Sequence, residues 1–191
     1  MLQDELIAAF HKTQSFKWDP KGGFKLASGL LSPFYVDCRT LMAFPHARYL
    51  VAKKAWEVIK DLQIDCLGGL EIGAISIATS ISDYAYSAAP RREWRIFFVR
   101  KQAKDHGLGR LVEGVVRTGD RALIVDDVLT SGGSVVKAIV AAREAGLEIT
   151  DALVIVDRKE QEGRARVEQT GVRVMSLLTI DDLMKGGPIP L

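Results

Sequence analysis

The sequence predicts an α/β protein with a central parallel sheet flanked by helices. From about residue 64 to residue 178, short apolar runs rich in branched residues alternate with longer segments of helical periodicity. The apolar runs are nearly continuous, as expected for strands that are buried on both faces. Right-handed crossovers would join such strands and place helices on both sides of the sheet.

The composition fits one ordinary globular domain. The chain has 191 residues, of which 48% are hydrophobic and 26% are charged. A formal net charge of +2 is too small to indicate nucleic-acid binding. No apolar run is long enough to span a membrane, and residues 1–5 lack the basic start of a signal peptide. Cys38 and Cys66 do not suggest a disulfide framework, so we expect a cytoplasmic protein.

The first forty residues do not follow the alternation of strands and helices. We expect them to form a helix that ends before Asp19, then a small hood with two short strands joined near Ser28 and Gly29. A longer helix follows, starting near Pro45. Its inward face is predicted to be Leu50, Val51, Ala55, Val58, Ile59 and Leu62.

The remaining elements alternate along the chain. Strands are predicted at residues 64–68, 94–99, 122–126, 151–156 and 172–178. A turn over residues 69–74 leads into a helix that ends near Ser87, and Gly146 is expected to end the helix that follows the central turn. These elements complete one sheet without an interdomain linker.

Residues 122–134 give the strongest indication of function. An apolar strand ends in Asp126 and Asp127, and a Thr-Ser-Gly-Gly-Ser turn then leads into a helix. Hydroxyls, backbone N–H groups and the positive end of a helix dipole favour phosphate at such a turn. The two acids suit sugar hydroxyls or a divalent cation. The alternative is a turn whose glycines only make the corner.

Residues 100–114 form the second unusual stretch. This segment carries four lysines and arginines, one histidine and three glycines, and it has no sustained apolar period. Long loops within compact domains are usually functional. We interpret it as a lid that closes over a polyanion such as diphosphate. A solvated basic hairpin tip is the alternative.

Four motifs resemble a known family. Residues 126–134, Asp-Asp-Val-Leu-Thr-Ser-Gly-Gly-Ser, resemble the phosphoribosyl diphosphate (PRPP) signature of type I phosphoribosyltransferases. Residues 100–107, Arg-Lys-Gln-Ala-Lys-Asp-His-Gly, resemble the catalytic loop of the orotate phosphoribosyltransferases. Residues 26–35, and residues 156–158 together with 176–182, are similar to other parts of that family. The set covers most of the chain in the family's order.

This resemblance implies a type I phosphoribosyltransferase fold in which residues 1–191 form a single domain. Residues 1–40 would be the N-terminal helix and hood, and residues 100–114 a mobile catalytic loop. The implied reaction transfers the phosphoribosyl group of PRPP to orotate, giving orotidine 5′-monophosphate and diphosphate. The family uses Mg²⁺, which PRPP rather than the protein alone would hold. A homodimer is also implied, with the loop acting in the neighbouring subunit's site and no nucleic-acid or membrane partner.

The resemblance also assigns roles to individual residues. The implied catalytic residues are Lys104, Asp105, His106 and Asp127. The implied PRPP-binding residues are Arg100, Lys101, Lys104, His106, Asp126, Asp127, Val128, Leu129, Thr130, Ser131, Gly132, Gly133 and Ser134. The implied orotate-binding residues are Phe34, Tyr35, Thr130 and Arg158. Arg158 could otherwise be an ordinary surface arginine, but its place just past a strand's carboxyl end favours a site residue.

Two positions depart from a common family pattern. Ala27 stands where some members have lysine, with Lys25 two residues away, and residues 71–73 carry no lysine. Two other functions stay open: transfer to another base such as a purine, and a PRPP-sensing regulator that binds nucleic acid. The loop sequence at residues 100–107 argues against transfer to another base. The near-neutral net charge and the intact loop argue against a regulator that binds nucleic acid.

Overall fold

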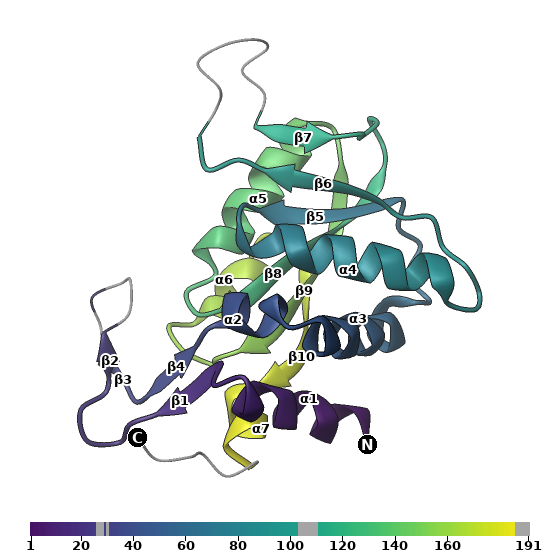
Figure 1. Ribbon diagram of the computed structural model, residues 1–191. Coiled ribbons are helices and arrows are strands. Elements are labelled where there is room, and N and C mark those ends of the chain that lie inside the picture. The colour runs from purple at the N-terminus through teal and green to yellow at the C-terminus, as the bar shows by residue number, and fades with distance from the viewer. Residues whose placement is uncertain (26–28, 30, 103–110, 186–191) are drawn as a thin grey trace.

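The centre of the structure is a six-stranded sheet. Its strands are β5 (Cys66–Leu70), β6 (Arg95–Val99), β7 (Val112–Gly114), β8 (Arg121–Leu129), β9 (Glu148–Asp157) and β10 (Arg173–Thr179). The structure is a computed structural model that describes residues 1–25, 29, 31–102 and 111–185. The strand order is β10-β9-β8-β5-β6-β7, and only β6 and β7 pair antiparallel (Figure 1). The predicted α/β class with a central parallel sheet is confirmed.

Helices cover both faces of the sheet, as predicted. The main ones are α3 (Pro45–Ile59), α4 (Gly73–Ser87) and α5 (Gly133–Glu144). α3 and α4 contribute to one apolar core and α5 to a second (Figure 1). In β8, Leu123 and Val125 belong to the first core, whereas Ile124 belongs to the second. Successive side chains of a strand point to opposite faces, so the unbroken apolar run fills both cores.

The first forty residues form the expected helix and short strands, together with elements that were not predicted. In chain order these are α1 (Leu2–Lys12), β1 (Phe16–Trp18), β2 (Phe24–Lys25), β3 (Leu31–Ser32), β4 (Phe34–Val36) and α2 (Cys38–Ala43). β2 pairs with β3, and β1 pairs with β4, both antiparallel. β1 and α2 were missed because three to six residues are too few to display a period.

The inward face of α3 differs from the prediction: Leu62 lies beyond the end of the helix, and Ala47 and Ala52 are also buried. Val58 is 36% exposed, whereas Trp56, which was not predicted, is only 7% exposed. The Trp56 ring centroid lies 5.6 Å from that of Trp94 and 6.5 Å from that of Tyr84 in α4. The edge of α3 that carries Trp56 is therefore buried against α4 and the start of β6. The periodicity of α3 does not reveal which edge meets a neighbouring helix.

Three smaller expectations were also compared with the structure. Gly146 has a φ of 88° and ends α5, as predicted, one residue after the C-cap Ala145. Cys38 and Cys66 are buried free thiols. Within the described ranges, no helix is both long enough and apolar enough to cross a membrane.

A close backbone contact holds the turn after β8. α6 (Gly163–Glu168) begins beside this turn. A Cβ atom on Gly132, whose φ is 74°, would lie 2.6 Å from the carbonyl oxygen of Gly163. A Cβ atom on Gly163 would collide with the carbonyl oxygen of Thr130. Both residues must therefore be glycine for the turn and α6 to approach this closely.

We predict that Gly163→Ala destabilises the protein. The methyl group would push α6 away from Thr130, at a cost of about 1–3 kcal/mol in the free energy of unfolding. Gly133→Ala is the matched control, because Gly133 also begins a helix and its Cβ would meet only the Ser131 hydroxyl, at 3.7 Å. Urea denaturation of both variants measures the difference, and equal stabilities would show that this contact is not constrained.

Candidate active site

A cavity of about 580 Å³ opens at the carboxyl ends of the parallel strands. Leu70 at the end of β5, Val128 near the end of β8 and Arg158 just after β9 all line it. Open α/β sheets bind ligands at this edge, where the loops after the strands converge. The cavity therefore lies where the sequence predicted the site.

The turn after β8 forms the part of this cavity that is suited to a phosphate. Thr130, Ser131 and Ser134 line it, as expected for hydroxyl donors. The left-handed conformation of Gly132 turns the chain into α5, which begins at Gly133. The free N–H groups and positive dipole end of α5 thus lie beside three hydroxyl groups, an arrangement that favours a phosphate.

The strand before this turn runs further than the sequence suggested. β8 does not end at the two acids but continues to Leu129. Val128 lines the cavity, whereas the side chain of Leu129 is 1% exposed and packs in the second core. Leu129 can therefore reach a ligand only through its backbone, and its carbonyl already accepts the N–H of Arg158 at 3.0 Å.

The two acids lie in the wall of the cavity. Asp126 is 6% exposed and its Oδ1 accepts the Asp127 N–H at 2.9 Å. Asp127 Oδ1 accepts the Val128 N–H at 2.8 Å. Burial, and then the neighbouring Asp127 charge, raise the pKa of Asp126 to about 8. This environment favours a proton on the acid pair, which could then donate a hydrogen bond to a ligand oxygen.

The first residue of α4 packs against these acids. A Cβ atom on Gly73 would lie 3.2 Å from the carboxyl carbon of Asp127. Residues 70–73, between β5 and α4, line the same cavity. The N–H of Glu71 donates to the Val99 carbonyl at 2.8 Å, which holds this segment beside β6. The positive end of a second helix therefore lies at the acid pair.

Arg158 is not an ordinary surface residue. Its side chain is only 5% exposed, and its Nη2 donates to Ser32 Oγ at 2.8 Å and to the Phe34 carbonyl at 3.0 Å. Its Nε lies 3.1 Å from Glu160 Oε2, an ion-pair distance, but makes no well-aligned hydrogen bond there. The Ser32 hydroxyl also donates to Glu160 Oε1, at 2.8 Å. Arg158 thus links the hood to the segment after β9.

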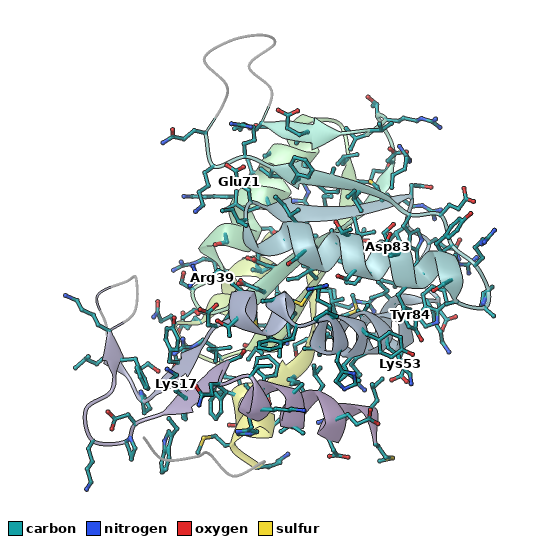
Figure 2. All side chains as sticks on the ribbon, viewed as in Figure 1. Lys17, Arg39, Lys53, Glu71, Asp83 and Tyr84 are labelled. Atoms are coloured by element: carbon teal, nitrogen blue, oxygen red, sulfur yellow. The ribbon has the colours of Figure 1, made fainter. Side chains whose placement is uncertain are left out.

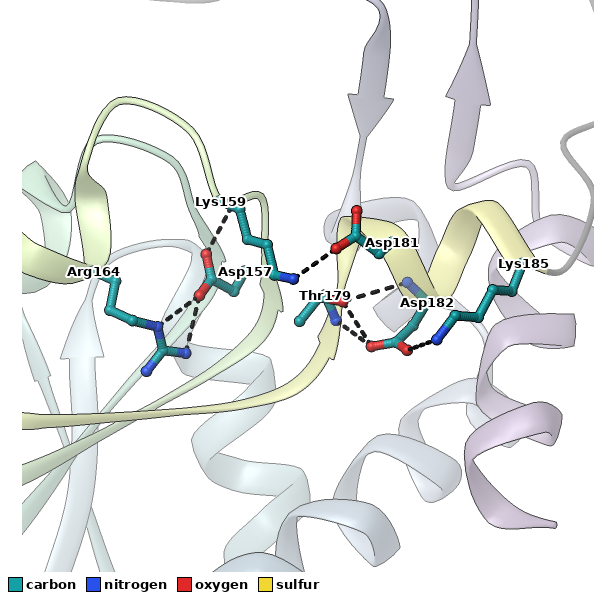
Figure 3. Close-up of polar contacts among 7 residues, drawn as sticks. All are labelled: Asp157, Lys159, Arg164, Thr179, Asp181, Asp182 and Lys185. Carbon is teal, nitrogen blue, oxygen red and sulfur yellow. Dashed lines mark hydrogen bonds and ion pairs between the residues drawn. The ribbon is translucent and has the colours of Figure 1, made fainter.

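A polar network fixes the chain on both sides of Arg158 (Figure 3). Asp157, at the end of β9, accepts the Lys159 N–H at 2.9 Å and two nitrogens of Arg164, each at 2.9 Å. Lys159 Nζ donates to Asp181 at 2.6 Å, which ties the segment to α7 (Ile180–Lys185). Asp157 and Arg164 were not predicted, because an Asp–Arg pair in a charged stretch gives no indication of burial.

The two aromatic residues expected at the base pocket take different positions. Tyr35 lines the cavity, and its ring centroid lies 5.6 Å from that of Phe24. The Phe34 ring stacks on Phe16 at 6.3 Å and packs against the first core. Adjacent residues of a strand point to opposite faces, so the two rings cannot share one pocket. Phe34 approaches the site through its carbonyl group, which Arg158 binds.

The predicted basic loop begins and ends next to the cavity. Lys101 lines the cavity, and its N–H donates to Glu71 Oε1 at 2.9 Å. The N–H of Arg100 donates to the Leu111 carbonyl at 2.8 Å, so the two ends of the loop are joined there. The Arg100 side chain forms an ion pair with Glu113, with 4.0 Å between Arg100 Nη1 and Glu113 Oε1. Lys104, Asp105 and His106 lie outside the described residues.

The residues of the cavity do not by themselves form a metal-binding cluster. Among residues 1–25, 29, 31–102 and 111–185, no group of three or more His, Cys, Asp or Glu side chains is arranged to hold a metal ion. Asp127 and Asp126 offer carboxyl oxygens on one wall only. This donor set fits a divalent cation that arrives with a substrate supplying the other ligands.

Comparison with known proteins agrees with this geometry. Residues 38–182 match the family of the phosphoribosyl transferase domain. The orotate phosphoribosyltransferase of Aquifex aeolicus is 38% identical over 184 residues, which cover 96% of this chain and 99% of that protein. Relatives of this similarity and coverage share both fold and family.

Solved structures give the same result. The orotate phosphoribosyltransferase of Mycobacterium tuberculosis, in complex with Fe(III) dicitrate, is 33% identical with a TM-score of 0.80, covering 96% of this chain and 99% of that one. Its structure in complex with PRPP has a TM-score of 0.73 at 28% identity, covering 95% and 91% of the two chains. The chain therefore belongs to the phosphoribosyltransferase family and, within it, to the orotate phosphoribosyltransferases.

Proposed function

We propose that this protein transfers the 5-phosphoribosyl group from PRPP to orotate, forming orotidine 5′-monophosphate for pyrimidine nucleotide synthesis and releasing diphosphate. The observation that carries the proposal is one cavity that joins a phosphate-binding turn, two sugar-facing acids and a buried arginine. The matched orotate phosphoribosyltransferases support orotate over another base. The same relatives favour an enzyme over a PRPP-sensing regulator.

The residues of the cavity divide between the two substrates. The 5-phosphate of PRPP would bind at the N-terminus of α5, with Thr130, Ser131 and Ser134 as hydroxyl donors. Asp126 and Asp127, whose pair favours a proton, would hold the ribose hydroxyls. Arg158 and Tyr35 would bind orotate, whose negative charge suits a guanidinium in a buried position.

The reaction breaks the bond between ribose C1 and the diphosphate oxygen and forms one between C1 and orotate N1. Positive charge develops on the ribose and negative charge on the diphosphate. Asp105 or His106, in the adjacent loop, would accept the N1 proton that this new bond displaces. Stabilisation of charge by preorganised groups would therefore lower the barrier most, and losing one such donor costs on the order of 3 kcal/mol. Lys101, and Lys104 in the adjacent loop, would stabilise the negative charge that develops on the diphosphate.

Mg²⁺ is the proposed cofactor, and it would offset the charge of the diphosphate. PRPP oxygens would provide most of its ligands, with Asp127 as the nearest acid of the protein. We further propose a homodimer in which residues 100–114 act in the neighbouring subunit's site. A cytoplasmic location fits the two buried free thiols.

The pH dependence of stability tests the buried acid. The pKa of Asp126 is about 8 in the folded protein against an ordinary value of 3.8. The folded state thus binds more protons than the unfolded state between these values, and stability falls as pH rises. Asp126→Asn removes this loss, so the variant should gain stability over the wild type increasingly from pH 4 to pH 8. Urea denaturation across that range measures the gain.

The control for this experiment is Asp83→Asn, at an exposed position on α4 (Figure 2). The free energy of unfolding of this variant should stay within about 0.5 kcal/mol of the wild-type value at every pH. A gain for Asp126→Asn that did not change with pH would show that Asp126 is ionised in the folded protein.

Metal dependence tests the proposed cofactor. Turnover of PRPP and orotate should stop when divalent ions are chelated and return when Mg²⁺ is added. After desalting, the protein alone should retain no stoichiometric metal by elemental analysis, because substrate supplies most of the ligands. Full activity in excess chelator would reject the proposed role of Mg²⁺.

The basic loop can be tested through Lys104. If Lys104 meets the diphosphate mainly in the transition state, Lys104→Ala should lower kcat by ~10²-fold or more and change the KM for PRPP much less. Lys53→Ala on α3 is the control for loss of one positive charge outside the cavity (Figure 2). An unchanged kcat would remove the loop from the chemistry.

The same variant tests action across a dimer. The defect of Lys104→Ala lies in the loop, and the defect of Asp127→Asn lies in β8 of the sheet. In a mixed dimer one site would have both defects and the other neither. Random exchange makes half of the dimers mixed, so activity should recover to about a quarter of the wild-type value. No recovery, with mixed dimers present by mass spectrometry, would place the loop in its own subunit's site.

A further inference from the structure

Arg39 is a cation of the cavity wall to which no role has yet been given. It lies in the first turn of α2 and lines the cavity together with Asp37. Its side chain is 73% exposed, so it can reach a ligand without rearrangement of the core. Figure 2 shows Arg39 on the same side of the molecule as Glu71, which follows β5.

Asp37 fixes the orientation of this guanidinium. Arg39 Nε donates to Asp37 Oδ1 at 3.0 Å, and Arg39 Nη2 donates to Asp37 Oδ2 at 3.1 Å. Asp37 is itself held, because it caps α2 by accepting the N–H groups of Arg39 and Thr40. A guanidinium has five N–H donors in one plane. Two of them bind Asp37, so the group is preorganised and keeps donors for a second anion.

The position of Arg39 matches the part of the site that lacks positive side chains. A smaller hollow of about 220 Å³ adjoins the acid pair, and Arg39, Ile72, Gly73 and Asp127 line it. The segment between β5 and α4 brings the positive end of α4 here, but its one charged side chain, Glu71, is negative. A diphosphate next to this segment would need a cation from elsewhere.

The other two described cations that line the cavity do not line the smaller hollow. Arg158 is buried and bound to Ser32, Phe34 and Glu160. Lys101 lies at the opposite end of the segment, where its N–H binds Glu71. Among the described residues, Arg39 is therefore the one cation that lines both the cavity and the smaller hollow beside Gly73 and Asp127.

We propose that Arg39, oriented by Asp37, binds the diphosphate group of PRPP in the same subunit and supplies the positive charge that residues 71–73 lack. The proposal rests on the proposed function, since it names the residue that holds one part of that substrate. It differs from the role of Lys104, because Arg39 is fixed before the substrate arrives. Its contact should therefore contribute to ground-state binding as much as to the transition state.

Calorimetric titration with two fragments of the substrate tests this assignment. Arg39→Ala should weaken binding of magnesium diphosphate roughly 10- to 100-fold, as expected for one charge-assisted hydrogen-bond pair. Binding of ribose 5-phosphate should stay within about twofold, because that fragment occupies the turn after β8. In turnover, the variant should raise the KM for PRPP more than it lowers kcat and leave the KM for orotate unchanged.

Two further variants make the test specific. Arg39→Lys keeps the charge but loses the planar fork, so its diphosphate affinity should fall between those of Arg39→Ala and the wild type. Arg91→Ala removes an exposed arginine that stacks on Tyr86, outside the cavity, and should bind both fragments normally. If Arg39→Ala did not fold, the affinities of Arg39→Lys for diphosphate and for ribose 5-phosphate would be compared with those of the wild type instead.

The outcomes separate this inference from the proposed function. A wild-type protein that bound neither fragment would reject the proposed function and this inference with it. Normal wild-type binding with unchanged diphosphate affinity in Arg39→Ala would reject only the role of Arg39. Equal weakening of both fragments would also reject it, because the effect would then be a general loss of positive charge.

Discussion

The arrangement of the site depends on the buried guanidinium of Arg158. It binds Ser32 and the Phe34 carbonyl in the hood, while its own backbone N–H binds Leu129 at the end of β8. One residue thus joins the hood, β8 and the segment after β9. Burying this charge is expensive unless it is paired and hydrogen-bonded, and Glu160 and Ser32 meet that requirement. The hood is therefore held in place by the residue proposed to bind the substrate.

Arg158 stabilises the fold, whereas the acid pair of Asp126 and Asp127 destabilises it. Asp126 is buried next to a second carboxyl group, and that unfavourable environment raises its pKa. Two apolar cores fix β8 on both faces, so the strand carries the acids to the cavity wall despite this cost. Groups held in a poor environment by a rigid scaffold are common at functional sites.

The parts of the fold that could be predicted are those with a sustained pattern. β8 and β9 were predicted because their apolar runs fill two cores, and the phosphate turn because its hydroxyls and glycines directly follow the acids. Short elements such as β1 and α2 were not predicted, since their pairing depends on distant segments. Arg39 was missed for the same reason. Nothing near it in the sequence shows that α2 brings it to Gly73.

The distribution of charge in the cavity constrains how a ligand can bind. The acids lie between two helix N-termini, those of α4 and α5, which meet the ends of β5 and β8. Each helix end favours an anion, whereas the carboxyl groups favour hydroxyls. A sugar that carries phosphate at both ends satisfies all three positions in one orientation, with its ring over the acids. A ligand with a single phosphate would leave one helix end without an anion. Under the proposed function, the charges at the sheet edge would thus favour a doubly phosphorylated sugar before any loop contributes.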